Sequence, residues 1–227
     1  MQKGDLSMPQ LEGMFEKQLA EAFAAIGTFN LAVFGKTGVG KSTLVNAVFG
    51  RDVAATGLGS PVTKGLLYYR MPDGFLGVYD SEGFETGTAG DSIVNGLRRI
   101  VADHRARPIN EQIHAAWYLV RWSDRRFEPA QERFVRELAG LGLPVIMVMT
   151  QVPSRDGVVH PEAEEFAAYI RGLNLPLSPR NEVVLTNALT DSFTQTPVFG
   201  LTSLLDVTYD VIPEAAAKAL TAAQMLD

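Results

Sequence analysis

Short apolar runs alternate with stretches of helical periodicity along most of the chain. The runs at 29–35, 114–122, 144–150 and 182–188 contain few polar positions, which is the pattern of strands buried on both faces. The segments between them carry apolar residues on one helical face. Buried strands that alternate with helices are typical of a mostly parallel sheet covered on both sides. We therefore expect an α/β fold of three layers, α/β/α.

Two neighbouring runs, at 64–71 and 75–80, interrupt the parallel pattern. They are joined by Pro72-Asp73-Gly74, a tight-turn sequence that is typical of an antiparallel hairpin. The sheet should therefore contain one antiparallel strand. The helices expected between the strands cover 42–49, 91–104, 129–142, 161–174 and 200–212.

Both ends of the chain also have helical patterns. Residues 8–26 carry Leu and Phe at a spacing of four, which predicts an amphipathic N-terminal helix packed on the rest. Residues 213–226 are rich in Ala and predict a C-terminal helix, which could be a natural end or the start of a further segment. No linker or repeat divides the chain, so residues 1–227 are expected to form a single domain.

Composition narrows the function classes. The net charge of −6 disfavours general binding to nucleic acids, because such binding depends on clustered Lys and Arg. The chain contains no Cys, which excludes disulfides and thiolate metal sites and suits a reducing compartment. No apolar run reaches about 18 residues, and the first residues lack the apolar region of a secretory signal. We therefore expect a cytoplasmic protein without a transmembrane segment.

The chemistry centres on the turn after the first strand. The stretch from Gly35 to Ser42, GKTGVGKS, fits G-x-x-x-x-G-K-[ST] and stands between an apolar run and a helix. Glycines let backbone N–H groups converge on phosphate oxygens, and the helix start adds partial positive charge. Lys41 can place its ammonium against the β- and γ-phosphates, and the Ser42 hydroxyl can bind Mg²⁺. The expected nucleotide contacts here are Lys36, Thr37, Gly38, Val39, Gly40, Lys41, Ser42 and Thr43.

Two further motifs follow in order. Thr63 stands in the loop after the first helix, and the stretch 80–83 (DSEG) matches D-x-x-G at the end of a strand. This order, over residues 29–211, resembles that of the P-loop GTPases, in particular the Era-like and interferon-inducible-GTPase-like branch related to the 50S ribosome-binding GTPases. The resemblance implies GTP or GDP as ligand, with Mg²⁺. It also implies a catalytic group of Lys41, Thr63 and Gly83, and the metal ligands Ser42, Thr63 and Asp80.

The residue after D-x-x-G departs from the familiar pattern. Many GTPases have a Gln there that orients the attacking water, whereas this chain has Phe84, whose ring cannot hydrogen-bond to water. The resemblance is therefore to GTPases that hydrolyse slowly alone or use a group from elsewhere, often from a dimer partner. Arg125 and Arg126 are candidates for that group, and a homodimer through the nucleotide face would bring one of them to the partner's site.

The two base-recognition motifs are degenerate. The fourth motif is usually [NT]-K-x-D, but here Pro153 replaces the Asp that accepts hydrogen bonds from guanine. Hydrogen bonds to a charged group are each worth roughly 1.5–3 kcal/mol, so guanine preference should weaken. Thr150 matches the motif, and Gln151 can still cover part of the purine face. In the fifth motif, Asn187 and Ala188 remain, and the Ala188 N–H can donate to guanine O6.

These features favour a GTP-binding protein with Mg²⁺-dependent, slow or partner-assisted hydrolysis that serves as a conformational switch. Gly- and Ser-rich loops at 51–64 and 81–92 would order around the triphosphate. Two alternatives stay open. One is an ATP-using P-loop enzyme, against which the hairpin after the first helix argues. The other is a nucleotide-gated interaction module that does not hydrolyse, which the losses at Phe84 and Pro153 favour.

Overall fold

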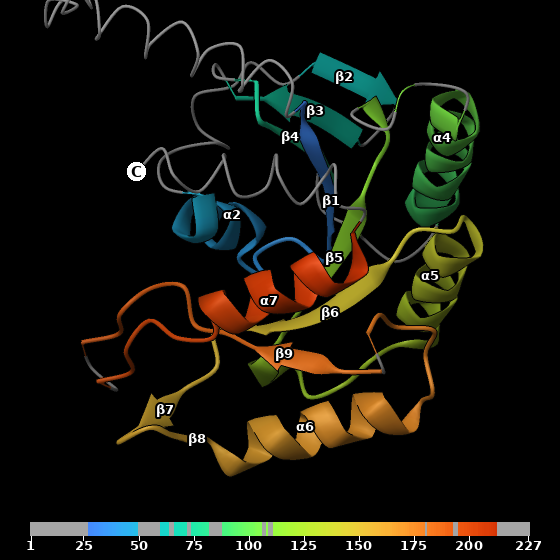
Figure 1. Ribbon diagram of the computed structural model, residues 1–227. Helices are drawn as coiled ribbons and strands as arrows, with labels where there is room; N and C mark the ends of the chain where they lie inside the picture. Colours follow the sequence, from blue (N-terminus) through green and yellow to red (C-terminus); the bar gives the residue numbers. More distant parts are fainter. Residues whose placement is uncertain are drawn as a thin grey trace, which may run out of the picture.

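The computed structural model describes residues 27–49, 60–63, 66–71, 74–81, 88–105, 108, 111–179, 181–192 and 195–212 (Figure 1). These residues form a seven-stranded sheet with helices on both faces and a separate two-stranded hairpin. The helices expected at 8–26 and 213–226 lie outside the described residues.

One strand of the sheet runs against the others. The strands are β1 (Phe29–Phe34), β2 (Ser60–Thr63), β3 (Leu66–Arg70), β4 (Leu76–Ser81), β5 (Ala115–Arg121), β6 (Val145–Thr150) and β9 (Val183–Leu185). Their order is β2-β3-β4-β1-β5-β6-β9; β3 pairs antiparallel with both β2 and β4, and the remaining neighbouring pairs are parallel. The expected mostly parallel sheet with one antiparallel strand is therefore confirmed. β2 is an added edge strand, in a segment where the sequence predicts a loop.

Helices cover both faces of this sheet (Figure 1). They are α2 (Lys41–Phe49), α4 (Thr88–Arg105), α5 (Pro129–Gly140), α6 (Pro161–Gly172) and α7 (Leu201–Val211). One apolar core joins the sheet to α4, α5 and α6, with Leu97, Leu138 and Phe166 among its buried side chains. The opposite core joins the sheet to α2 and α7, where Leu44 and Leu204 are buried. The predicted three-layer arrangement is thus confirmed.

β1 lies between β4 and β5 at the centre of the sheet, and all six of its side chains are buried. Its register pairs Val33 with Asp80 of β4 and with Trp117 of β5. Because the three strands are parallel, their carboxyl ends meet at one edge, the place where open α/β sheets bind ligands. The segments that follow β1, β4, β5, β6 and β9 are therefore brought together there.

A small hairpin that the sequence pattern does not predict follows β6. It pairs β7 (Ser154–Arg155) with β8 (Val158–Val159), and the turn between them places Asp156 and Gly157 at φ values of 51° and 77°. Positive φ at both central residues is typical of a type I′ turn. Strands this short carry too few positions to give a periodic signal. The hairpin lies directly after the fourth motif, between Pro153 and the start of α6.

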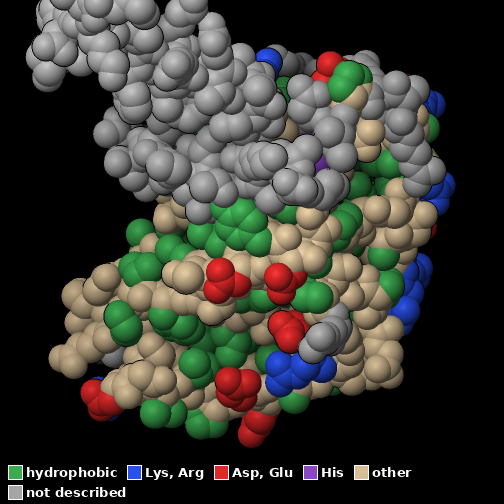
Figure 2. Space-filling model, viewed as in Figure 1, with side chains coloured by type: hydrophobic (Ala, Val, Ile, Leu, Met, Phe, Trp, Pro, Cys, Tyr) green, Lys and Arg blue, Asp and Glu red, His purple; other side chains and the backbone are tan. Residues whose placement is uncertain are grey.

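Charged side chains are unevenly spread over the face shown in Figure 2. Acidic side chains lie over α7 and near α6, whereas most Lys and Arg side chains on this face lie at the edge formed by α4 and α5. The exposed acids of α7 are Asp206 and Asp210. No helix in the described part of the chain combines the length and the apolar character needed to cross a lipid bilayer.

The loop between β9 and α7 depends on the glycine at its end. Gly200 has a φ of +78°, and a Cβ atom there would collide with the Leu185 carbonyl oxygen. We expect Gly200→Ala to lower the free energy of unfolding by about 2 kcal/mol or more, because the backbone cannot move aside cheaply. The control is Gly172→Ala at the end of α6, where the new Cβ would meet no atom within 4 Å apart from the adjacent residues and the backbone of its own helix. That variant should be neutral or slightly stabilising. Equal midpoints of the two variants in urea unfolding would refute the steric argument.

Candidate nucleotide-binding site

The expected phosphate loop leaves the end of β1 and enters α2. Gly35, Gly38 and Gly40 have φ values of 145°, 79° and 93°, a range that glycine adopts most readily. A Cβ atom on Gly35 would lie 2.5 Å from the Leu119 carbonyl oxygen, so the loop passes too close to β5 for a side chain. The Leu44 N–H donates to the Gly40 carbonyl at 2.9 Å and begins the helix. The predicted tight loop between strand and helix is therefore present.

Lys41 curls back along this loop. Its ammonium donates to the Gly35 carbonyl at 3.0 Å and to the Lys36 carbonyl at 3.3 Å. Burial lowers the pKa of the Lys41 ammonium below its ordinary value, and the nearby Asp80 carboxylate offsets part of this effect. The charge is thus held by neutral carbonyl acceptors, which phosphate oxygens can replace with stronger, charged ones.

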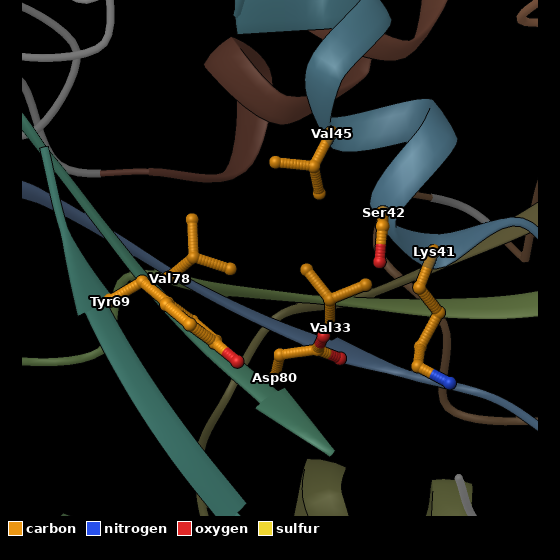
Figure 3. Close-up of a pocket in the computed structure, with 7 residues that line it drawn as sticks. All are labelled: Val33, Lys41, Ser42, Val45, Tyr69, Val78 and Asp80. Carbon is orange, nitrogen blue, oxygen red and sulfur yellow. The ribbon is translucent and has the colours of Figure 1, made fainter. Parts of the chain in front are cut away.

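Lys41, Ser42 and Asp80 line one hollow beside the loop (Figure 3). Lys41 and Ser42 project from the first turn of α2, and Asp80 projects from β4. A hydroxyl and a carboxylate are hard oxygen ligands of the type that Mg²⁺ prefers. No group of three His, Cys, Asp or Glu side chains among the described residues could hold a metal ion by itself. The hollow therefore offers two side-chain oxygen ligands, from Ser42 and Asp80, that could hold a metal ion. Its wall is completed by Val33, Val45, Tyr69 and Val78.

Of the two residues expected to sense the γ-phosphate, the structure describes Thr63 but not Gly83. Thr63 ends β2, which is paired with β3 at the sheet edge. Gly83 and Phe84 lie outside the described residues. The first half of the D-x-x-G motif lies in β4, where the Ser81 hydroxyl donates to the Val33 carbonyl at 3.4 Å. The roles of Thr63 and Gly83 therefore stay predictions.

Thr150 and Gln151, at the end of β6, hold the loop in place. The buried Thr150 hydroxyl lies 2.6 Å from the Val39 carbonyl oxygen and 3.3 Å from the Val120 carbonyl oxygen, and can donate to either. The Gln151 side-chain amide donates to the Gly38 carbonyl at 3.2 Å. The sequence predicts contacts of both residues with the nucleotide. The sequence could not predict that they hold the loop, because these hydrogen bonds join segments more than a hundred residues apart.

A second hollow opens beside Thr150 and Gln151, and we name it the base hollow. Six residues predicted to bind the nucleotide line it: Gly40, Thr43, Thr150, Gln151, Asn187 and Ala188. Leu44 and Leu189 complete the lining. Leu189 is 64% exposed, and sequence reasoning missed it because a single Leu in a loop carries no signal. The fourth and fifth motifs thus meet at one place, on the opposite side of the start of α2 from the hollow lined by Lys41, Ser42 and Asp80.

The structure shows what surrounds Pro153, which stands where the fourth motif usually has an Asp. Val152 is fully buried, and the carbonyl of Pro153 accepts the His160 N–H at 2.9 Å, which ties this residue to the start of α6. The next carboxylate along the chain, Asp156, is exposed at the turn of the β7–β8 hairpin and does not line the base hollow. The missing carboxylate is therefore not replaced by its neighbour in sequence.

Paired charges occupy a third hollow next to the loop. Lys36 forms an ion pair with Glu128 at 3.0 Å, so its ammonium is directed toward the start of α5. Arg121 pairs with Asp124 at 2.9 Å. Thr37, Val39, Ser123 and Arg126 complete the lining. Among the predicted nucleotide contacts, Lys36, Thr37 and Val39 therefore line a different hollow from Lys41. Glu128 was missed because it lies 92 residues from Lys36 in the sequence.

The two arginines considered as catalytic candidates differ in their contacts. Arg125 forms an ion pair with Glu162 of α6 and lies over the Trp122 ring, 5.7 Å from its centre. Arg126 lines the third hollow beside the phosphate loop and makes no ion pair with any residue that the structure describes. Of the two candidates, Arg126 is therefore the one that lies beside the phosphate loop.

The brace from Thr150 gives a test of how the loop is held. We expect Thr150→Val to weaken the binding of guanine and adenine nucleotides by the same factor, about tenfold, because it leaves the buried Val39 carbonyl without its donor. Thr150→Ser keeps the hydroxyl and should bind nearly as well as the unaltered chain. Titration calorimetry measures both affinities. A change in the ratio between the two bases would instead assign Thr150 to the base.

Comparison with known proteins agrees with this geometry. A family model described as "50S ribosome-binding GTPase" matches residues 30–151, more than half of the chain. Among curated proteins, GTP-binding protein A of Dictyostelium discoideum is 29% identical over 111 residues, which cover 48% of this chain and 23% of that protein. The chain thus spans about a quarter of that relative's length.

Solved structures share the fold. A probable GTP-binding protein engB aligns over 80% of this chain and 97% of its own, with a TM-score of 0.52 and 18% identity. Era of Aquifex aeolicus, bound to GDP.AlF4-, aligns over 83% of this chain and 58% of its own, with a TM-score of 0.51 and 20% identity. A septin GTPase domain from Chlamydomonas reinhardtii aligns over 88% and 92%, with a TM-score of 0.51 and 14% identity. Identities this low show the fold alone. The family model matches residues 30–151, which include the phosphate loop, and therefore shows that the chain belongs to the 50S ribosome-binding GTPase family.

Proposed function

We propose that this chain binds GTP with Mg²⁺, hydrolyses it slowly or with the help of a partner, and uses the reaction as a conformational switch. Membership of the family supplies guanine-nucleotide binding; the metal, the hydrolysis and the switch are the proposal. The observation that carries it is the meeting of Lys41, Ser42 and Asp80 around one hollow at the phosphate loop (Figure 3). They provide a cation for the phosphates and two oxygen ligands for a metal.

The loop would bind phosphate through backbone N–H groups that face away from the sheet. The peptide unit between Val39 and Gly40 illustrates this, because its carbonyl lies 2.6 Å from the Thr150 hydroxyl at the end of β6. In a trans peptide the N–H points opposite to the carbonyl. The Gly40 N–H therefore points away from β6. N–H groups held in this way can bind phosphate oxygens without reorganising.

Lys41 would transfer its ammonium from the Gly35 and Lys36 carbonyls to the β- and γ-phosphate oxygens. Ser42 and Asp80 fit Mg²⁺, which would neutralise negative charge on the transferred phosphoryl group when bound. Because Lys41 is largely removed from water, its charge acts on the phosphates with less screening than an exposed lysine would. These groups stabilise charge and do not activate water.

The attacking water needs a group that the third motif does not supply, since Phe84 stands where a Gln would orient it. Arg126, beside the loop and free of ion pairs within the described residues, could stabilise transition-state charge in a second copy of the chain. Arg125 is less suited because Glu162 already holds it. We therefore place partner-assisted hydrolysis above slow hydrolysis by a single copy.

The ATP-using enzyme is the weaker alternative. The chain belongs to a GTPase family, and β3 lies antiparallel beside β4 as in the hairpin that argued against such enzymes. The interaction module that binds nucleotide without hydrolysis remains the second candidate, because Phe84 removes the usual water-orienting group while the phosphate loop is complete.

The two lysines of the loop give a matched pair of variants. We expect Lys41→Ala to abolish detectable GTP binding, because the ammonium faces the phosphate site. Lys36→Ala should bind GTP within about threefold of the unaltered chain, because it loses only a half-exposed ion pair with Glu128. Calorimetric titration with GTP and GDP, with and without Mg²⁺, measures this. Unchanged affinity in Lys41→Ala would contradict the proposed site.

Hydrolysis can be tested by its dependence on protein concentration. We expect the rate per molecule to rise with concentration, because the assisting group comes from a second copy. Arg126→Ala should remove that rise, and Arg125→Ala should keep it, since Arg125 is held by Glu162. Release of inorganic phosphate is the measurement. A low rate independent of concentration would rule out the partner's contribution, and no release at all would favour the interaction module.

A further inference from the structure

We infer that Asn187, through its side-chain oxygen Oδ1, is the hydrogen-bond acceptor for the N1–H and N2–H₂ groups of guanine in this chain. The inference rests on the proposed guanine-nucleotide site. It assigns to the fifth motif a task that an Asp of the fourth motif performs elsewhere, and which Pro153 cannot perform here.

The base hollow requires an acceptor if guanine is to be preferred. The Watson–Crick edge of guanine carries two neighbouring donors, and a donor buried without an acceptor weakens binding. Thr150 has a hydroxyl close to two backbone carbonyls, and Pro153 has no side-chain acceptor. Apart from the hydroxyl of Thr43 in the first turn of α2, the side-chain acceptors that remain among the lining residues are the amide oxygens of Gln151 and Asn187.

Asn187 is fixed in one orientation. Its side-chain Nδ2 donates to the Leu189 carbonyl at 2.5 Å and to the Pro197 carbonyl at 2.9 Å. Carbonyl oxygens only accept, so the atom that faces them must be the nitrogen and the other must be the oxygen. Both N–H groups of the amide are thereby used. The remaining hydrogen-bonding atom of the side chain is the acceptor Oδ1.

The backbone of Asn187 is used as well. Its N–H donates to the Phe199 carbonyl at 3.1 Å, and its carbonyl accepts the Phe199 N–H at 3.0 Å. The residue is only 8% exposed and lines the base hollow. An acceptor held by four hydrogen bonds loses little conformational freedom when a ligand binds. The Gln151 side chain, by contrast, is on an exposed residue and is held by one hydrogen bond to Gly38.

The neighbouring residue completes a pattern that suits guanine. Ala188 also lines the base hollow, and its N–H is a donor next to the Asn187 acceptor. Guanine presents an acceptor at O6 and donors at N1 and N2, which this pair complements. Adenine presents a donor at N6 and an acceptor at N1, so both contacts would be mismatched. The two residues together therefore favour guanine without a carboxylate.

The experiment compares three ligands on three forms of the chain. GDP, inosine diphosphate and ADP are titrated, with Mg²⁺, into the unaltered chain, Asn187→Ala and Gln151→Ala. Inosine diphosphate keeps O6 and N1–H but lacks the N2 amine, so it deletes one donor from the ligand and leaves the protein intact. We expect the unaltered chain to bind GDP about tenfold more tightly than inosine diphosphate. That ratio should fall to about one in Asn187→Ala and persist in Gln151→Ala.

The outcomes are separable. A purely structural role of Asn187 would weaken all three ligands equally in Asn187→Ala and leave the ratio unchanged, which would overturn the inference. A ratio that collapses in Gln151→Ala instead would assign the acceptor to Gln151. Should Asn187→Ala fail to fold, equal binding of GDP and inosine diphosphate by the unaltered chain is still enough to refute the inference. Failure of the unaltered chain to bind any of the three would overturn the proposed function itself.

Discussion

The phosphate loop has a fixed shape because side chains hold its carbonyl oxygens. The hydroxyl of Thr150 lies 2.6 Å from the carbonyl oxygen of Val39, the amide of Gln151 holds that of Gly38, and Lys41 holds that of Gly35. Thr150 and Val39 lie 111 residues apart in the sequence, so the loop depends on the pairing of β6 with β5 and of β5 with β1. The shape of the loop is therefore a property of the whole central sheet, and a shift of β6 would change it.

The sequence predicted the parts of this arrangement that are local. The stretch from Gly35 to Ser42 combines a strand end, a turn and a helix start, and each leaves a mark in neighbouring residues. The meeting of Asp80 with Ser42 followed from parallel strands and a known order of motifs, and the structure places both at one hollow. The brace from Gln151 and the ion pair between Lys36 and Glu128 could not be predicted, because no local pattern records a contact between distant segments.

The fourth motif has two physical tasks that this chain separates. Thr150 and Gln151 keep the mechanical task, since both are placed to hold the phosphate loop. The chemical task of accepting hydrogen bonds from the base is lost at Pro153, whose carbonyl is instead bonded to the N–H of His160. The hydrogen bonds that hold the loop come from Thr150 and Gln151 and do not involve position 153. Phosphate affinity and base selectivity can accordingly change independently in a site of this kind.

Charge around the loop is divided unequally between its two sides. On the side of Ser42 and Asp80, the partly buried Lys41 ammonium acts on Asp80 with less screening than an exposed lysine would have. On the other side, Glu128 and Asp124 neutralise Lys36 and Arg121, and Arg126 is the cation that no described residue pairs. A single exposed guanidinium exerts little attraction beyond about 8–10 Å at physiological salt. It can stabilise charge in a partner's site once the two are in contact, but it cannot by itself draw them together, so any pairing must obtain its affinity from other surfaces.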